Sequence, residues 1–173
     1  FNDRLTGSID WFKKKSIDLI YDKPLPISTG NSSIKTNVGS ISNTGWELLL
    51  SSVNVESENV YWSTSLNLSS VKNNVDELSQ EFFITGSKRW EVGRSLYDFW
   101  IRDYAGVDPS NGDALWFKDI LDAEGNPTGE RDVTNSYAEA TRYYQDKTSL
   151  PSLQGGFSNF VKYKNFDLNF LFN

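Results

Sequence analysis

The sequence predicts an all-β fold built from antiparallel hairpins, and two observations support this prediction. First, residues 155–173 alternate between apolar and polar side chains in two runs, which the short polar turn Lys164-Asn165 separates. Alternation places every second side chain on one strand face, so a hairpin with one apolar and one polar face is expected. Second, the same pattern recurs in the first 71 residues. An aromatic-rich hairpin is typical of a transmembrane β-barrel wall and also of a soluble β-sandwich, so the hairpin alone leaves both open.

The composition indicates a folded chain and argues against several functions. Aromatic residues make up 14% and apolar residues 38% of the 173 residues, which is too apolar for a disordered segment. The net charge of −6 and the lack of a long basic stripe argue against nucleic acid as a partner. Cys, Met and His are absent, so the sequence offers no disulfide, thiolate metal site or histidine base, and we expect no cofactor. The missing initiator Met predicts that the sequence begins inside a longer precursor.

The first two strands are predicted to form a hairpin. Residues 5–12 and 17–22 both alternate, and the charged run Lys13-Lys14-Lys15 between them is the expected turn. Pro24 and Pro26 are expected to end the second strand, because proline cannot donate a hydrogen bond to a neighbouring strand.

A second hairpin is predicted after a loop. Residues 27–44 are rich in Ser, Asn, Thr and Gly, which is a composition typical of loops. Residues 46–55 and 61–69 then predict two strands around a turn at 56–59. The strand at 61–69 carries small polar residues along most of one face, which suits a sandwich strand and equally a strand that lines a wet lumen.

The pattern changes between residues 72 and 154. Turn-forming residues gather at 108–113 and 124–129, and residues 137–145 are expected to form a short helix capped by Asn135 or Ser136. Short β-like pieces lie between these turns, at 81–85 and 95–101. A stretch of this length without a long strand is unusual for a soluble connection but ordinary in outer-membrane barrels, which have short turns on one side and long loops on the other.

This asymmetry predicts which side each connection occupies. Three short turns, at 13–15, 56–59 and 164–165, are expected on the periplasmic side. The long connections at 23–45 and 72–154 are expected on the other side, with residues 72–154 outside the cell.

Four short motifs occur along the chain in a recognisable order. They are Asp10-Trp11-Phe12-Lys13-Lys14 with Asp18-Leu19-Ile20; Asn37-Val38-Gly39 with Asn43, Gly45, Glu47 and Leu48; the run from Tyr104 to Asp113; and the run from Pro151 to Asn159 with Tyr163 to Leu168. Together these motifs resemble those of SusC/RagA-type TonB-linked (TonB-dependent) outer-membrane transporters, and they cover essentially the whole chain.

The resemblance implies the late part of a large β-barrel in the cell outer membrane that imports glycans or oligopeptides. It also implies a SusD-like surface lipoprotein as partner and energy from TonB, acting through an N-terminal part that this sequence lacks. The plug and the closing strands are missing too, so a fragment is expected. Its parts would be barrel hairpins at 1–71, a long extracellular loop region at 72–154 and a further barrel hairpin at 155–173.

A lipid-facing surface follows from the barrel interpretation. The apolar residues expected to face lipid alternate with Ser, Asn and Asp. They are Trp62, Leu66, Leu68, Phe166, Leu168 and Phe170.

Aromatic residues gather in the long loop region and are the candidate contacts for a substrate or partner. They are Trp90, Tyr97, Trp100, Tyr104 and Trp116, with Phe99 nearby. Such rings stack on the apolar faces of sugars, but a long loop also needs a small core of its own. Trp116 is the better contact candidate because it follows the turn at 108–113, whereas Trp100 is expected to be structural because aromatic residues flank it.

Catalysis and metal binding are not expected. The acidic residues of the loop region define no pair with the separation that glycoside hydrolysis requires. They are Asp98, Asp103, Asp108, Asp113, Asp119 and Asp122. The segment 108–113 contains calcium-type ligands but lacks the spacing of an EF-hand loop. The alternative function, from another class, is a soluble β-sandwich carbohydrate-binding module, in which a second sheet would cover the apolar face.

Overall fold

The computed structural model describes residues 3–25 and 27–173, and these are mostly in β-strands. The chain divides into two compact units, one formed by Phe1–Ser79 with Leu150–Asn173 and the other by Gln80–Ser149. All strand pairs are antiparallel. The predicted all-β, antiparallel fold class is therefore confirmed.

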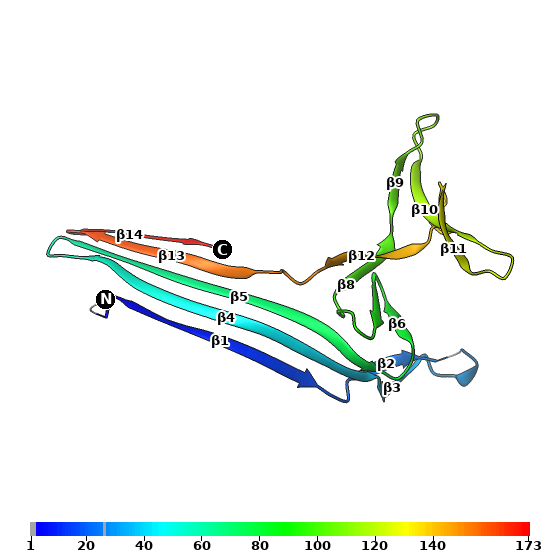
Figure 1. Cartoon of the computed structure of the whole chain (residues 1–173), viewed down its shortest axis with the longest axis horizontal. Helices are drawn as coiled ribbons and strands as arrows, with labels where there is room; N and C mark the ends of the chain where they lie inside the picture. Colours follow the sequence, from blue (N-terminus) through cyan, green and yellow to red (C-terminus); the bar gives the residue numbers. More distant parts are fainter. Residues whose placement is uncertain (1–2, 26) are drawn as a thin grey trace. The chain divides into compact units, whose positions relative to one another are not determined.

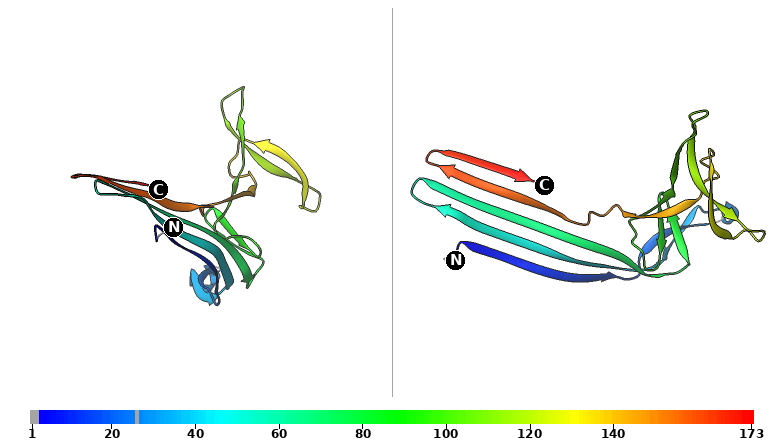
Figure 2. Two further views of the ribbon diagram at one scale, coloured as in Figure 1. Left: turned by 60° about the vertical axis from the view of Figure 1, so that its left-hand side comes forward. Right: turned by 45° about the horizontal axis from the view of Figure 1, so that its top comes forward.

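The first unit is built around one sheet of five strands, which lie side by side in Figures 1 and 2. Their order in the sheet is β1-β4-β5-β13-β14. Their bounds are β1 Leu5–Ser16, β4 Gly39–Glu56, β5 Val60–Leu78, β13 Gln154–Tyr163 and β14 Phe166–Phe172. The edge strands β1 and β14 do not pair with each other, so the sheet is open. The predicted C-terminal hairpin and its turn at 164–165 are confirmed by the pairing of β13 with β14.

A small hairpin completes the first unit. Strands β2 (Ile20–Pro24) and β3 (Ser33–Asn37) pair with each other, and a short 3-10 segment, η1 (Ile27–Thr29), lies between them. Pro24 is the last residue of β2, as predicted, and Pro26 lies outside the described residues.

The residue that joins this hairpin to the large sheet is Val38, which is 1% exposed. Its amide donates to the carbonyl of Leu19 (2.8 Å), and its carbonyl accepts from the amide of Ser79 (2.7 Å). The next residue, Gly39, has φ +151°, and a Cβ there would lie 1.8 Å from the carbonyl oxygen of Glu77. Only glycine allows this approach of two backbones, which explains the Asn-Val-Gly motif as a structural joint.

Three sequence predictions about the first unit are wrong. The first two strands do not form a hairpin with each other, because β1 pairs with β4 and β2 pairs with β3. Lys13, Lys14 and Lys15 do not form a turn but continue β1, and they pair with residues 42–44 of β4. Residues 27–44 are not one loop, because β3 and the first six residues of β4 lie within them. In the last two places the pairing of long strands overrides a local composition that is typical of turns and loops.

The second unit contains two small sheets. The four-stranded sheet has the order β12-β8-β7-β6, and the three-stranded sheet has the order β11-β10-β9. The bounds are β6 Phe82–Thr85, β7 Lys88–Glu91, β8 Asp98–Arg102, β9 Tyr104–Val107, β10 Ala114–Leu121, β11 Pro127–Thr134 and β12 Arg142–Thr148. Tyr143 joins the two sheets, because its hydroxyl donates to Asp119 of β10 (2.7 Å).

The helix predicted at 137–145 is wrong. Residues 142–148 form β12, in which Tyr143 and Tyr144 pair with Ile101 and Trp100 of β8. The predicted cap forms a single turn only, in which the carbonyl of Ser136 accepts from the amides of residues 139 and 140. Across residues 3–25 and 27–173, no helix is long and apolar enough to cross a membrane.

Candidate functional site

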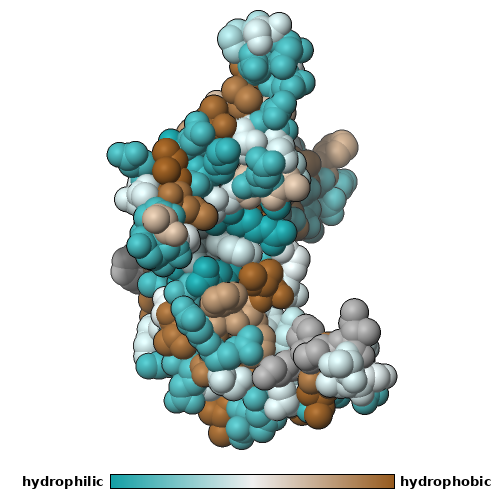
Figure 3. Space-filling model, turned by 90° about the vertical axis from the view of Figure 1, so that its right-hand side faces the viewer, coloured by the Kyte–Doolittle hydropathy of each residue, from teal (hydrophilic) through white to brown (hydrophobic). Residues whose placement is uncertain are grey.

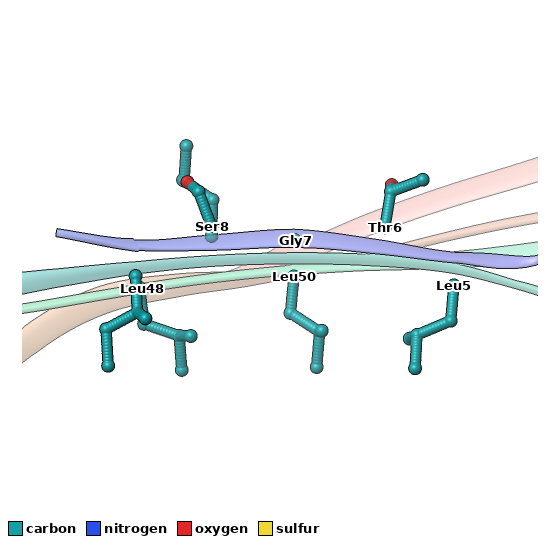
Figure 4. A pocket seen from close by; sticks show the side chains of 8 residues that line it. Leu5, Thr6, Gly7, Ser8, Leu48 and Leu50 are labelled. Carbon is teal, nitrogen blue, oxygen red and sulfur yellow. The ribbon is translucent and has the colours of Figure 1, made fainter.

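The strand register of the large sheet collects apolar side chains on one face. Leu48 of β4 pairs with Ile9 of β1 and with Leu68 of β5, and Leu50 pairs with Leu66. Directly paired residues share a face, so these side chains are neighbours. The face continues onto β13 and β14 through the pairs of Leu66 with Phe157, Trp62 with Val161 and Val161 with Leu168. In Figure 4, Leu5, Leu48 and Leu50 point to one side of the sheet, whereas Thr6 and Ser8 point to the other.

We call this surface the apolar band. Its members are Leu5, Ile9, Trp11, Trp46, Leu48, Leu50, Trp62, Leu66, Leu68, Phe157, Val161, Tyr163, Phe166, Leu168, Phe170 and Phe172. All six residues predicted to face lipid belong to it. Ile9 is 75%, Leu168 60% and Phe166 79% exposed, and in the described part of the first unit no second sheet packs over them. The described residues of the band include no charged side chain.

Aromatic residues mark both ends of the apolar band. Trp11 and Trp46 form a directly opposed pair at one end. Trp62, Tyr163 and Phe166 lie at the other end, beside the turns that follow β4 and β13. A belt of aromatic residues at each limit of an apolar band is the arrangement that membrane–water interfaces favour.

A shallow depression interrupts the band at Gly7. It is lined by Leu5, Ile9, Leu48 and Leu50 among others. Figure 4 shows Leu5, Leu48 and Leu50 on the same side of the sheet near Gly7. A Cβ at Gly7 would lie 2.7 Å from the backbone oxygen of Leu49, so the close approach of β1 and β4 requires glycine here. The depression is therefore a gap in a flat surface rather than an enclosed site.

Asn159 is a buried polar residue within the band and is 3% exposed. Its side-chain oxygen accepts from the indole nitrogen of Trp62 (3.0 Å) and from the hydroxyl of Thr64 (2.8 Å). Thr64 in turn accepts from Asn54 (2.7 Å), which accepts from Ser52 (2.8 Å). This chain of hydrogen bonds lets polar side chains remain on an apolar face and holds the Trp62 ring in place.

The opposite face of the sheet is rich in small polar side chains. They include Thr6, Ser8, Ser51, Ser63, Ser65, Asn67 and Ser158. The hydroxyls of Ser51 and Ser65 lie 3.3 Å apart, and Asn67 accepts a hydrogen bond from the backbone amide of Gly156 (2.8 Å). Leu49 and Leu171 are exposed apolar exceptions on this face.

Two of the five candidate contact residues lie together in the three-stranded sheet of the second unit. Trp116 of β10 pairs with Tyr104 of β9, and their ring centroids are 5.5 Å apart. The ring centroid of a third residue, Tyr137, lies 4.9 Å from that of Trp116, and the Arg102 guanidinium lies 4.3 Å from the Tyr137 ring centroid. Tyr104 and Tyr137 are 55% and 56% exposed, so this aromatic cluster is open to a ligand.

Of the other three candidates, Trp90 and Trp100 belong to the four-stranded sheet, and Tyr97 lies in the turn between its strands β7 and β8. Trp90 lies 6.4 Å from the buried ring of Phe83, which indicates a small core. Trp100 pairs with Tyr144, and the guanidinium groups of Arg142 and Arg89 lie 5.2 and 5.6 Å from its ring. Tyr97 lies between the strands, and its carbonyl accepts from the Lys88 ammonium and the Ser149 amide.

Tyr144 is the centre of a polar and cationic cluster in this sheet. Its hydroxyl donates to Glu91 (2.9 Å), and the guanidinium of Arg94 lies 3.8 Å from its ring centroid. Burial raises the pKa of the Tyr144 hydroxyl well above its ordinary value, and the hydrogen bond to the Glu91 carboxylate raises it further. Burial also lowers the pKa of Lys88, whose ammonium lies 3.5 Å from the Phe99 ring centroid.

Sequence reasoning missed Tyr137, Arg102 and Tyr144. Both tyrosines fall in the helix expected at 137–145, and that helix does not predict the contact of Tyr137 with Trp116 or the pairing of Tyr144 with Trp100. The run of aromatic and long side chains at 142–144 is a β signal that could have found β12. Nothing in the local sequence indicates that Tyr137 meets Trp116, because the chain between them forms a whole hairpin.

The acidic turn at 108–113 is closed by its own hydrogen bonds. The amide of Asp108 donates to the carbonyl of Asp113 (2.8 Å), and Asp108 accepts from the hydroxyl of Ser110 (2.6 Å) and from its amide. These two bonds, the hydroxyl first, hold the pKa of the Asp108 carboxyl below its ordinary value. In the part of the chain that the structure describes, no three acidic side chains are grouped to hold a metal ion.

Other loop carboxylates are likewise engaged with neighbouring groups. Asp103 lies 3.3 Å from Arg131, and Asp119 accepts from Tyr143. The backbone amide of Asn126 donates to Asp122 (2.8 Å) and lowers the pKa of that carboxyl. These carboxylates therefore stabilise turns and sheet contacts.

Several residues of the sequence motifs have structural roles. The ring of Phe12 covers Gly45, where a Cβ would come within 2.6 Å of it. A Cβ at Gly155 would lie 2.1 Å from the backbone oxygen of Asn67, and Asn159 anchors the Trp62 network. The motifs thus mark places where the large sheet is tightly built.

The exposed apolar residues of the second unit are dispersed rather than continuous. They are Ile84, Val92, Ile101, Val107, Ile120, Leu121 and Val133. On the face shown in Figure 3, hydrophobic atoms likewise form separate patches among hydrophilic ones.

Comparisons with known proteins place this sheet and its motifs in a family. TonB-dependent receptor P39 of Formosa agariphila is 31% identical over an alignment covering 100% of this chain and 20% of the receptor. TonB-dependent receptor P26 of the same organism is 32% identical, covering 99% of the chain and 18% of the receptor. TonB-dependent receptor SusC of Bacteroides thetaiotaomicron is 25% identical, covering 98% and 17%. A search of family models gives no match.

Solved structures agree with these relatives. The chain superposes on the RagAB peptide transporter with a TM-score of 0.80 and 29% identity, covering 98% of this chain and 19% of that one. The RagAB peptide importer in its closed-closed state gives a TM-score of 0.79. These relatives are named as receptors, transporters or importers, which is consistent with the expectation of no enzyme, and the chain spans about one fifth of their length. The chain therefore belongs, as a segment, to the SusC/RagA-type family of TonB-dependent transporters.

Proposed function

We propose that this chain supplies part of the barrel wall and a long loop region of an outer-membrane, TonB-dependent importer. The observation that carries the proposal is the apolar band, which is free of charge, exposed and bordered by aromatic residues. Lipid tails would cover such a surface, whereas its exposure to water would be unfavourable in free energy. A soluble β-sandwich module would need a second sheet over the same face, so the importer is favoured.

The predicted division was 1–71 and 155–173 for the barrel wall and 72–154 for the loop region, but β5 continues to Leu78 and β13 begins at Gln154. We therefore propose that the five strands of the large sheet form the wall and that residues 80–149 form the loop region outside the cell. The turns at 57–59 and 164–165 lie at one end of the sheet, since the amide of Lys164 donates to the carbonyl of Asn59 (2.9 Å). We place this end on the periplasmic side, because short turns occupy that side of such barrels.

The predicted placement of Lys13, Lys14 and Lys15 beside those turns is wrong. These residues pair with Thr44, Asn43 and Ser42, near the end of the sheet where β4 begins and β5 finishes. They therefore lie at the opposite end from the two turns, and the proposed topology places them toward the cell exterior.

We propose a glycan or an oligopeptide as the imported substrate and a SusD-like surface lipoprotein as the partner. The solved relatives named as peptide importers support the peptide alternative, and the exposed ring cluster of Tyr104, Trp116 and Tyr137 is compatible with either. TonB would act through a part of the protein outside this segment.

Two measurements on the intact protein test this function. Spin labels at Leu66 and Leu168 should be accessible to lipid-soluble quenchers, and shielding of both by protein would contradict the barrel wall. Cysteines introduced at Asn111 and Glu58 can be treated with an impermeant reagent on whole cells. Labelling at Asn111 but not at Glu58 is expected, and the reverse would overturn the topology. An uptake panel of glycans and oligopeptides, with and without the lipoprotein, would then identify the substrate.

A further inference from the structure

Three lysines extend the face of the apolar band just beyond the Trp11–Trp46 pair. Lys13 is two residues from Trp11 along β1, and Lys72 is two residues from Ser70, which pairs with Trp46. Side chains two residues apart on a strand share a face, so Lys13, Lys15 and Lys72 continue the face of the band. All three are exposed.

The register sets the spacing of these lysines. Thr44 of β4 pairs with Lys13 on one side and with Lys72 on the other, so the two lysines lie on one line across three strands. With neighbouring strands about 4.8 Å apart, their backbones are separated by about 10 Å. Their flexible stems can bring both ammonium groups to one anion of headgroup size.

The acidic groups beside this cluster leave two of the three lysines unpaired. Lys15 lies 3.7 Å from Glu77. Asp76 accepts hydrogen bonds from Ser42 (2.8 Å) and Asn74 (2.9 Å). Among residues 3–25 and 27–173, neither Lys13 nor Lys72 lies within 4.0 Å of a carboxylate oxygen. The charges of Lys15 and Lys13 act on the nearby Asp76 carboxylate without an ion pair at Lys13, so an external anion can still approach both ammonium groups.

We propose that Lys13 and Lys72, assisted by Lys15, form a binding site for the phosphate of an anionic lipid headgroup. The proposal rests on the proposed function, because the apolar band must lie in a membrane for a headgroup to reach this position. Continuity supports a lipid as occupant: acyl chains on the band would place their headgroup immediately beyond the tryptophan pair, where the positive charges lie. A diffusible anion has no acyl chain to contact the apolar band, so the band would not contribute to its binding.

Lys14 offers a matched control within the same segment. It pairs with Asn43 and therefore points to the opposite face of the sheet, although its charge and sequence neighbours are the same. A variant at Lys14 changes the net charge as much as one at Lys13, but does not change the charge on the face of the band. Any effect that depends only on net charge will therefore appear in both variants.

The experiment uses the intact receptor in nanodiscs of phosphatidylcholine with and without phosphatidylglycerol. Native mass spectrometry after release from the nanodiscs reports how many phosphatidylglycerol molecules remain bound, and titration of this lipid gives its Kd. Since each lysine near an anionic surface contributes about a fivefold change in affinity, Lys13→Gln alone, the charge-matched partner of Lys14→Gln, should weaken retention by about fivefold. Lys13→Gln with Lys72→Gln should weaken it by about 25-fold. Lys14→Gln should leave retention unchanged.

Several outcomes would overturn the proposal. Unchanged retention in the double variant would do so, as would an equal loss in Lys14→Gln. Full competition by inorganic phosphate would show that the cluster binds a free anion instead of a lipid. Quencher accessibility at Leu168, measured in the same samples, separates the two failures. An accessible Leu168 with no specific retention refutes only the headgroup site, whereas a shielded Leu168 refutes the membrane position itself.

Discussion

The large sheet of the first unit and the small sheets of the second unit use the same aromatic and aliphatic residues in different surroundings. In the second unit, cations cover the rings: Arg94 and Arg131 lie 3.8 and 3.9 Å from the ring centroids of Tyr144 and Tyr143. In the apolar band, rings such as Phe166 and Trp11 remain exposed beside other apolar side chains. Cation–π contacts make a ring compatible with water, whereas an exposed, uncharged band is compatible with lipid. This difference is what the proposed barrel wall, in lipid, and the proposed loop region, in water, would each require.

The strongest way to break this comparison is to place a charge on the apolar band. Leu168→Arg should cost roughly 2–4 kcal/mol in the free energy of unfolding if the site lies near the bilayer midplane. Asn169→Arg is the matched control, because the neighbouring residue points to the polar face. The measurement is denaturant unfolding of the intact protein in lipid vesicles. Equal costs for both variants would show that the two faces meet the same solvent.

The second prediction concerns the joint at Gly39. Gly39→Ala should destabilise the first unit by about 1–3 kcal/mol or more, because a Cβ meets the Glu77 carbonyl and the positive φ disfavours alanine. Gly30→Ala is the control, since Gly30 also has a positive φ of 75° but has no atom within 4 Å of its Cβ position. Unfolding of both variants would be compared by denaturant titration. A smaller effect at Gly39 than at Gly30 would contradict the close approach of the two backbones.

How far the sequence predicts this molecule depends on whether a pattern is local. The C-terminal hairpin was predicted because alternation and turn lie within nineteen residues. The lysine run at 13–15 was mistaken for a turn because β1 continues past the end of the apolar band, and a charged run has the composition of a turn. The polar start of β4 was mistaken for a loop for a different reason: Ser40 and Ser42 are buried by neighbouring strands, which no local pattern shows.

The candidate contact site was only partly accessible to sequence reasoning. The aromatic composition of the loop region identified Trp116 and Tyr104, and the structure brings these two together. Tyr137 joins them through a pairing of distant segments, which no local pattern encodes. Of the remaining candidates, Trp90 and Trp100 lie in the other sheet of this unit and Tyr97 lies in the turn between its strands β7 and β8. The composition alone did not show that the candidates form two separate groups.

A third prediction separates ligand contact from loop stability. Trp116→Ala should weaken capture of the lipoprotein or substrate by roughly 1–3 kcal/mol, because aromatic anchors dominate binding energy and the half-buried Trp116 contacts the exposed rings of Tyr104 and Tyr137. Trp100→Ala should instead make the loop sensitive to protease, because its ring packs among Tyr144 and two arginines. Affinity and limited proteolysis would be measured for each variant. Normal affinity in both would remove the contact role of these rings.

The smallest expected effect is a local response to acid. Asp108 has a lowered pKa in the folded protein, so its carboxylate contributes stability above its ordinary pKa, and this contribution is lost as the pH falls through the lowered value. Below about pH 4 the turn at 108–113 should therefore open more often. The rate at which an acid-stable protease cleaves the wild type within this turn should rise as the pH falls. Asp108→Asn should remove most of the pH dependence of the cleavage rate. An unchanged pH dependence in this variant would show that another group causes it.

The backbone bonds around Val38 have a mechanical consequence. The amide of Leu19 donates to Gly39, the amide of Val38 to Leu19, and the amide of Ser79 to Val38. Three strand ends therefore meet at one buried residue, and a pull on any of them loads several hydrogen bonds at once. Bonds loaded in parallel must break together, whereas those of a frayed strand end break one at a time. A displacement of the β2–β3 hairpin is therefore resisted by hydrogen bonds to the start of β4 and to the residue that follows β5, all of which involve Val38 or its neighbour Gly39.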